Sequence, residues 1–360
     1  MKRLALLFAV VGCADNTLGA TSQNATCPAT QAFAVSACIC EDFDDIGNLI
    51  VGKSVAQDHA TLAVMGSTRA INNFQVRGDF RPHGGLTATG NLQVTGSLST
   101  PATVDDIGNI EVDGDLAIGG DLKGIGRLAV GGALSVAGKD TFLGYEEVAA
   151  TAPYTAVAAP ECGCGGSTAI DVAGMVAAAK TANDNTAAGV PTSFKNIGAA
   201  RLELTTGSYY LTDLASIGAT FVSVTGHVSL YLDGNLEQIG AAWIKLENGG
   251  MLDLYVSGSV RSIGHLDLGN KWDPSAFRLY IGGGDKATIN VGNQIYNGAI
   301  YAPNAVVEYI GNTQIRGAIT AKRLTGVGNL ELGYAAPHCP VDEPDPTPPA
   351  PPAGEPPVLL

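Results

Sequence analysis

The sequence predicts an all-β fold, a parallel β-helix or solenoid with one inserted helix. From Gly66 to Gly144, glycine recurs in steps of six, and only Asn72 and Ala102 interrupt the series. Apolar residues stand two positions before and two positions after many of these glycines. Read in steps of 18, residues of one kind also align in columns. A fixed period of this kind is the signature of a repeat architecture.

The chain begins with features of an export signal. Lys2 and Arg3 precede an apolar run, residues 4–11, that is too short to span a bilayer. The stretch VVGC, residues 10–13, resembles the lipobox of bacterial lipoproteins. The resemblance implies a signal peptide at residues 1–12, a lipid on Cys13 and a lipidated, cysteine-containing segment at residues 13–45. In the alternative, an ordinary signal peptide is cleaved and Cys13 is incidental.

The other cysteines are disulfide candidates. An even number of cysteines in an exported chain suggests a disulfide framework, although the sequence does not fix the pairing. Two C-x-C pairs could also supply four thiolates to zinc, but structural zinc sites usually use C-x-x-C spacing. The candidates are Cys27, Cys38, Cys40, Cys162, Cys164 and Cys339.

Residues 46–145 are predicted to form the regular part of the solenoid. Within each hexad, alternation places two apolar side chains on one face of a short strand, and the glycine makes the turn. Three hexads make a triangular coil of 18 residues, and stacked coils bury a continuous core. Phe74, Leu92, Ile110 and Leu128 form one such core column. Asn73, Asn91 and Asn109 align likewise, which predicts an amide ladder at one corner.

This region resembles a known family. The stretch IEVDGDLAIGGDL, residues 110–122, is similar to the hexads of the bactofilins, bacterial proteins that polymerise through a triangular β-helix. The resemblance covers roughly residues 46–144 and implies the architecture and a capacity for self-association. Bactofilins act on the cytoplasmic side, whereas this chain carries export features.

Residues 146–200 are predicted to form a C-x-C loop and one helix. The apolar residues of the helix fall near helical spacing, and Gly189 and Pro191 end it. This helix could cover the end of the solenoid. Its apolar positions are Ile170, Val172, Met175, Val176 and Ala179.

A second β-helical domain with looser coils is predicted at residues 201–336. LYLDGNLEQIG, residues 230–240, returns as LYVSGSVRSIG at residues 254–264. The run from IYAPNA to IRGAI, residues 300–319, resembles a β-helical domain of unknown function found in predicted bacterial surface and pilus-associated proteins. The resemblance implies a surface location and no established chemistry. Residues 337–360 are proline-rich and acidic, which predicts a disordered tail.

One motif suggests nucleotide binding. GNLIVGKS satisfies G-x-x-x-x-G-K-[ST] with Gly47, Gly52, Lys53 and Ser54. The residues between the glycines are strand formers, however, and DDIGNIEV at 105–112 repeats DDIGNLIV at 44–51 without the Lys-Ser. GNLQV at 90–94 and GNLEL at 328–332 are further relatives. The motif therefore predicts a strand and a corner, and no nucleotide site.

Neither a metal site nor a catalytic site is predicted. Glu41, Asp42, Asp44 and Asp45 are weak calcium candidates, but they lack the spacing of an EF-hand loop, and a solvated acidic turn is the simpler interpretation. The five histidines are scattered. On the 18-residue grid, Asp115 and Asp121 have no carboxylate neighbours, so the outer face offers no paired acids for glycoside cleavage. We expect no cofactor.

These features predict a non-enzymatic lipoprotein of the cell envelope, in the outer membrane or at the cell surface, with a structural or adhesive role. The net charge of −14 argues against nucleic-acid binding. Expected partners are the membrane through the lipid, a second copy of the chain, or an envelope glycan or protein. A glycan- or protein-binding module and a carbohydrate-active enzyme are the alternatives. An exposed tyrosine row would favour glycan binding, although these residues could equally be packed: Tyr209, Tyr210, Tyr231, Tyr255 and Tyr280.

Overall fold

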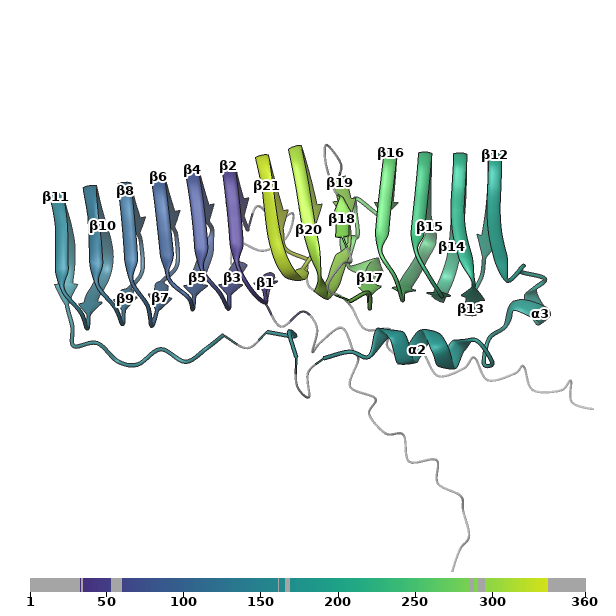
Figure 1. Cartoon of the computed structure of the whole chain (residues 1–360), viewed down its shortest axis with the longest axis horizontal. Helices are drawn as coiled ribbons and strands as arrows, with labels where there is room; N and C mark the ends of the chain where they lie inside the picture. Colours follow the sequence, from purple (N-terminus) through teal and green to yellow (C-terminus); the bar gives the residue numbers. More distant parts are fainter. Residues whose placement is uncertain are drawn as a thin grey trace, which may run out of the picture.

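The computed structural model describes residues 33, 35–52, 60–160, 162–165, 169–284, 288–290 and 295–335. The signal peptide, Cys13, Cys27, Cys339 and the proline-rich tail lie outside these residues. Every strand pairing between described residues is parallel, and the pairings join 21 strands into one sheet that winds as a solenoid (Figure 1). The predicted fold class is therefore confirmed.

The first half of the chain forms regular coils, named the N-half below. From β4 to β10, paired residues are 18 positions apart, as predicted. Phe74, Leu92, Ile110 and Leu128 form one continuous column. The strands are β1 (Ala37–Ile39), β2 (Phe43–Val51), β3 (Ala60–Val64), β4 (Thr68–Val76), β5 (Gly78–Pro82), β6 (Leu86–Val94), β7 (Leu98–Thr100), β8 (Val104–Val112), β9 (Leu116–Ile118), β10 (Leu122–Val136) and β11 (Asp140–Thr151).

The second half, named the C-half, has coils of variable length. Ile310 pairs with Val327, 17 positions on, whereas Val260 pairs with Ile289, 29 positions on. The strands are β12 (Ser193–Leu204), β13 (Gly207–Leu211), β14 (Asp213–Leu232), β15 (Leu236–Val256), β16 (Val260–Gly269), β17 (Phe277–Ile281), β18 (Thr288–Asn290), β19 (Ile295–Asn297), β20 (Ala299–Arg316) and β21 (Ile319–Gly333), with a 3-10 turn, η2 (Pro274–Ala276), before β17.

The two halves form one stack of coils, in an order that differs from the sequence. The N-half runs from β2 at the centre of the rod to β11 at one end, and the C-half runs from β12 at the opposite end back to the centre (Figure 1). There β21 pairs with β1 and β2. We name this junction the seam. The solenoid thus includes residues 37–45, which we expected to lie in a separate N-terminal segment, and β12 begins before the expected boundary at residue 201.

Each regular coil presents three outer surfaces. A corner glycine divides the long strand into two arms, and a short strand such as β3 or β5 makes the third side. We call the surface before the corner glycine the isoleucine face, the surface after it the amide face, and the third side the covered face. At the interruption of the glycine series, Asn72 takes a positive φ of 110°, which asparagine tolerates better than most residues.

A return segment, residues 152–179, connects the two ends of the rod along the covered face. Its helix, α2 (Val172–Ala179), begins at Asp171, whose side chain accepts a hydrogen bond from the Gly174 N–H. The helix lies beneath the C-half (Figure 1) and buries Val172 and Val176. Within the described residues, neither this helix nor α3 (Asn185–Ala188) is long and apolar enough to cross a membrane.

The position of α2 corrects the expectation that one helix covers the end of the solenoid. The helical stretch is broken in two, because the Asn183 amide bonds the carbonyl oxygens of Ala179 and Lys180. Instead, α3 lies beside the last short strand, where the Asn185 side chain bonds both the N–H and the carbonyl of Tyr210 in β13. Part of that strand's free edge is therefore satisfied, while α2 covers a flank.

The tyrosine row is packed. Tyr209 belongs to the inner core of the solenoid. The others stack along the covered face, with ring centroids 4.8 Å apart for Tyr231 and Tyr255 and 4.6 Å apart for Tyr255 and Tyr280. Together with α2 they form a second apolar cluster outside the coil. These rings are thus unavailable as an exposed platform for sugars.

Candidate functional site: the seam and the amide face

At the seam, two stretches with nearly the same sequence lie side by side. GNLEL of β21 pairs with GNLIV of β2, so that Gly328 faces Gly47 and Asn329 faces Asn48. Gly47 has φ +154°, and a Cβ there would lie 1.6 Å from the Gly328 carbonyl oxygen. Because a side chain at this position would collide with the neighbouring coil, the first glycine of the suspected nucleotide loop has a structural role. Lys53 and Ser54 lie outside the described residues.

An asparagine ladder crosses the seam at the edge of the amide face. Side-chain amides bond from coil to coil, with N···O distances from 2.6 to 2.9 Å. The predicted part of this ladder is confirmed, and the structure extends it on the other side of the seam. The full ladder is Asn312, Asn329, Asn48, Asn73, Asn91 and Asn109.

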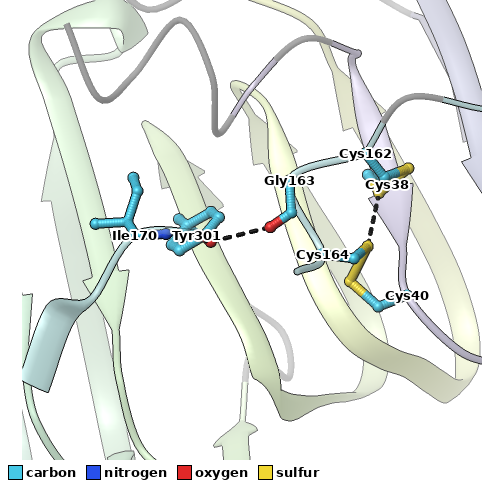
Figure 2. The surroundings of a disulfide bond; sticks show 7 residues. All are labelled: Cys38, Cys40, Cys162, Gly163, Cys164, Ile170 and Tyr301. Carbon is cyan, nitrogen blue, oxygen red and sulfur yellow. Dashed lines mark hydrogen bonds between the residues drawn. A yellow bond between two sulfur atoms is a disulfide. The ribbon is translucent and has the colours of Figure 1, made fainter. Parts of the chain in front are cut away.

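Two disulfides tie the return segment to the seam. Cys38 is bonded to Cys162 and Cys40 to Cys164, so the two C-x-C motifs pair with each other in parallel (Figure 2). Each bond joins residues 124 positions apart. These bonds use four of the six candidate cysteines. The sulfurs of Cys38, Cys162 and Cys164 lie within 4.8 Å of one another, so a metal ion at this point would compete with the disulfides for the same atoms.

A tyrosine fixes the same segment a few residues further on. The Tyr301 hydroxyl donates to the Gly163 carbonyl oxygen at 2.9 Å and accepts from the Ile170 N–H at 3.0 Å (Figure 2). Tyr301 is fully buried in β20. The return segment therefore contacts the coils of both halves beside the seam, through covalent bonds to β1 and hydrogen bonds to β20.

The calcium candidates do not gather around one point. Glu41 lies near the cations of Lys322 and Arg323, at 3.7 and 3.4 Å. Asp42 accepts from the Ser67 N–H, and Asp44 pairs with Arg69 at 2.9 Å. Within the described residues, these carboxylates form no group close enough to share an ion. They serve instead as links between neighbouring coils.

Asp45, the fourth candidate, points into the core. It is buried and accepts a hydrogen bond from the Tyr309 hydroxyl across the seam. Burial raises the pKa of Asp45 to about 6, although the hydrogen bond from Tyr309 lowers it. Tyr309 fits there because its neighbour in β21 is Gly326, where a Cβ would lie 2.5 Å from the tyrosine ring. The Asp45 contact joins the two halves inside the coil.

A groove runs along the amide face across the seam. Its volume is about 730 Å³. Five residues of the asparagine ladder form one margin, and a second outward column carries Gln314, Glu331, Ile50, Gln75 and Gln93. Gln75 donates to Gln93 at 2.7 Å, so the lining amides bond along the rod. The groove offers donors and acceptors in a row rather than a converging catalytic set.

Other carboxylates are used structurally. Asp115 and Asp121 accept hydrogen bonds from the Ala133 and Lys139 N–H groups of the next coil at 2.8 and 2.9 Å. These carboxylates therefore link adjacent coils at the corners of the solenoid.

Asp106 is fully buried in the core, and no described side chain donates to it. Burial, helped by the charge of Asp105, raises its pKa to about 7. It faces packed core rather than a cleft that could admit substrate.

The C-half contains a buried ionic cluster that was not expected from the sequence. The Arg278 guanidinium bonds both oxygens of Asp253, one of them at 2.7 Å, and His227 Nε2 lies 3.0 Å from the same carboxylate. Burial disfavours the ionised form, but His227 and Arg278 hold the pKa of Asp253 below its usual value. The available signal was one charged residue two positions before tyrosine in both LDLYV and FRLYI.

Comparison with known proteins adds one match. Residues 161–336 match DUF7305, a domain of unknown function. The DUF7305 region begins at the C-x-C loop of the return segment and ends after β21. It therefore takes in the C-half together with Cys162 and Cys164, and it leaves out the N-half with their disulfide partners Cys38 and Cys40. The match agrees with the resemblance carried by residues 300–319.

No curated protein matches the chain. Among solved structures, the crystal structure of an ice binding protein from an Antarctic bacterium, Flavobacteriaceae, is 11% identical. The alignment covers 88% of this chain and 99% of that chain, with a TM-score of 0.12. A score this low supports no statement about function.

Proposed function

We propose that the protein is a non-enzymatic scaffold of the cell envelope, held to a membrane by a lipid on Cys13. The observation that carries the proposal is the single stack of parallel coils that both halves build together. A solenoid whose backbone hydrogen bonds run along one axis resists bending and extension, which suits a spacer or platform at a surface. The two disulfides are consistent with an oxidising compartment.

The arrangement of acids supports a scaffold over an enzyme. A glycoside hydrolase needs two carboxyl groups that face a sugar across a cleft. Here the described carboxylates with strongly raised pKa values, Asp45 and Asp106, lie in the core. Asp253 is buried against Arg278.

Membrane attachment tests the envelope part of the proposal. Cys13→Ser should move the protein from the membrane fraction to the soluble fraction after cell lysis, since the lipid can then no longer be attached. Cys27→Ser is the matched control, because it removes a neighbouring thiol and should leave the protein in the membrane fraction. Membrane attachment of the Cys13→Ser chain would refute the lipid anchor, and electron microscopy of the released chain should show rods of uniform length.

A second candidate function, an envelope glycan- or protein-binding module, is favoured by the amide groove. A row of amides repeated at roughly 4.8 Å suits an extended polymer with repeating hydroxyl or amide groups. Gln75→Ala with Gln93→Ala should lower retention on purified cell-wall glycan. Thr87→Ala on the isoleucine face is the control. Equal retention of both variants would argue against the groove as the binding site.

A further inference from the structure

The isoleucine face carries an exposed apolar stripe that the fold itself does not use. Directly before the corner glycine, eight coils in succession place one residue in the same column. Seven of these side chains are apolar and between 41% and 73% exposed, and Thr89 is the exception. In order along the rod they are Ile310, Val327, Ile46, Ile71, Thr89, Ile107, Ile125 and Leu143.

A second column on the same face carries polar and charged residues, two positions before the first. Strand register places these residues beside the stripe on the same coils. In the same order they are Glu308, Thr325, Asp44, Arg69, Thr87, Asp105, Lys123 and Thr141. The charges on the two sides of Thr87 are opposite at equal distances. One coil away lie Arg69 and Asp105, and two coils away lie Asp44 and Lys123.

We propose that this face binds a second copy of the chain, with the two rods antiparallel and a two-fold axis passing through the coil of Thr87 and Thr89. A two-fold contact opposes each residue to the residue equally far on the other side of the axis. Arg69 then faces Asp105 of the other copy, and Asp44 faces Lys123. In the stripe, Ile71 faces Ile107 and Ile46 faces Ile125.

The charge pattern selects this register over its neighbours. Moving the axis one coil toward β4 would oppose Arg69 to its own copy, and moving it one coil toward β8 would do the same to Asp105. An axis between the coils of Arg69 and Thr87 would oppose Asp44 to Asp105. Since like charges in a desolvated contact cost several kcal/mol, the axis through Thr87 is favoured over these three, and it opposes two pairs of opposite charges.

The area also suits a second copy. The exposed stripe amounts to on the order of 600 Å², the upper end of what a typical monomer leaves exposed. The charged column beside it supplies the remainder of the roughly 800 Å² that each partner buries in a stable complex. Seven coils overlap in this dimer, from Val327 to Leu143, and Ile310 lies beyond the overlap.

Cysteine crosslinking tests the axis directly. Thr89→Cys places a thiol opposite its own copy, so the full chain, made in an oxidising compartment and kept in mild detergent, should form a disulfide-linked dimer. Ile310→Cys is the matched control, also exposed and outside the overlap, and should stay uncrosslinked. Equal crosslinking of the two variants, or none in either, would overturn the proposal.

Light scattering and charge reversal test the contacts. Ile107→Asp should weaken dimerisation on the order of 100-fold or more, because each dimer contains the substitution twice, and Ile310→Asp should leave it unchanged. Arg69→Asp should weaken the dimer, and adding Asp105→Arg should restore it by exchanging the two charges. A monomeric wild-type chain, or failure of the double variant to recover while circular dichroism shows both chains folded, would contradict the dimer.

Discussion

The two halves of the rod differ in how the outward-facing side chains of their coils find partners. In the N-half, the outer surfaces of the 18-residue coils carry asparagine, aspartate and glutamine side chains that bond from coil to coil, mostly in exposed positions. In the C-half, coils of variable length turn tyrosines outward, where they pack with α2 in a second apolar cluster, and an Arg-Asp pair is also buried. Where the coil length is constant, neighbouring coils satisfy each other's outer side chains. Where the length varies, outer apolar side chains need another segment of the chain, such as α2, to bury them.

Removing the two disulfides between the return segment and the seam should have the largest effect on stability. Replacing all four cysteines with serine, at positions 38, 40, 162 and 164, removes the closure of a ring of 124 residues and should lower the free energy of unfolding by about 5 kcal/mol. Replacing only Cys38 and Cys162 should cost much less, since the other bond still closes the same long ring. Urea unfolding of the oxidised proteins measures both, and an equal loss in the two variants would contradict this account.

The buried pair of the C-half should be far more sensitive than an exposed pair of the N-half. Arg278→Ala leaves Asp253 buried beside His227 without the guanidinium that bonds both its oxygens, which should cost about 3 to 5 kcal/mol. Arg81→Ala removes an exposed pair with Asp79 and should cost less than about 1 kcal/mol. Thermal unfolding of both variants makes the comparison, and similar losses would show that the two halves do not differ in this respect.

In the N-half, Asp106 should make stability depend on pH. Its pKa is raised to about 7, so between about pH 4 and pH 7 the folded state binds a proton that the unfolded state has lost. Stability should therefore fall as the pH rises through this window, by a few kcal/mol in all. Asp106→Asn should make the profile shallower and leave the smaller contribution of Asp45, whose pKa is raised to about 6. Asp105→Asn, one residue away and exposed, should largely preserve the profile. An unchanged profile for Asp106→Asn would rule out Asp106 as the source.

Much of the N-half could be predicted from the sequence because its contacts repeat at one interval. Phe74, Leu92 and Asn91 need only a period of 18 to be placed. The seam could not be predicted in this way, since Leu49 meets Leu330 across nearly the whole chain and no period connects them. The similarity of GNLIV and GNLEL was visible, but it showed two corners of one kind and not that they touch.

The site was predictable by residue type more than by arrangement. The two C-x-C motifs were recognised as disulfide candidates, yet their parallel pairing depends on where the return segment passes β1. The sequence did not decide whether the tyrosines of LYLDG and LYVSG are exposed or packed, because it does not show which surface α2 covers. Asp253 and Arg278 were missed because a single charged residue in a strand does not show whether it will be exposed or buried.

The seam also imposes an order on biosynthesis. Strands β1 and β2 are made first, but the partner that completes one of their edges, β21, is made almost last. During the whole interval that edge resembles an unpaired sheet edge, which can recruit any extended chain it meets. Contacts between such distant parts of a chain also form slowly. A nascent chain that stops before Ile319 would therefore hold the beginnings of two shorter solenoids, with no rod to join them.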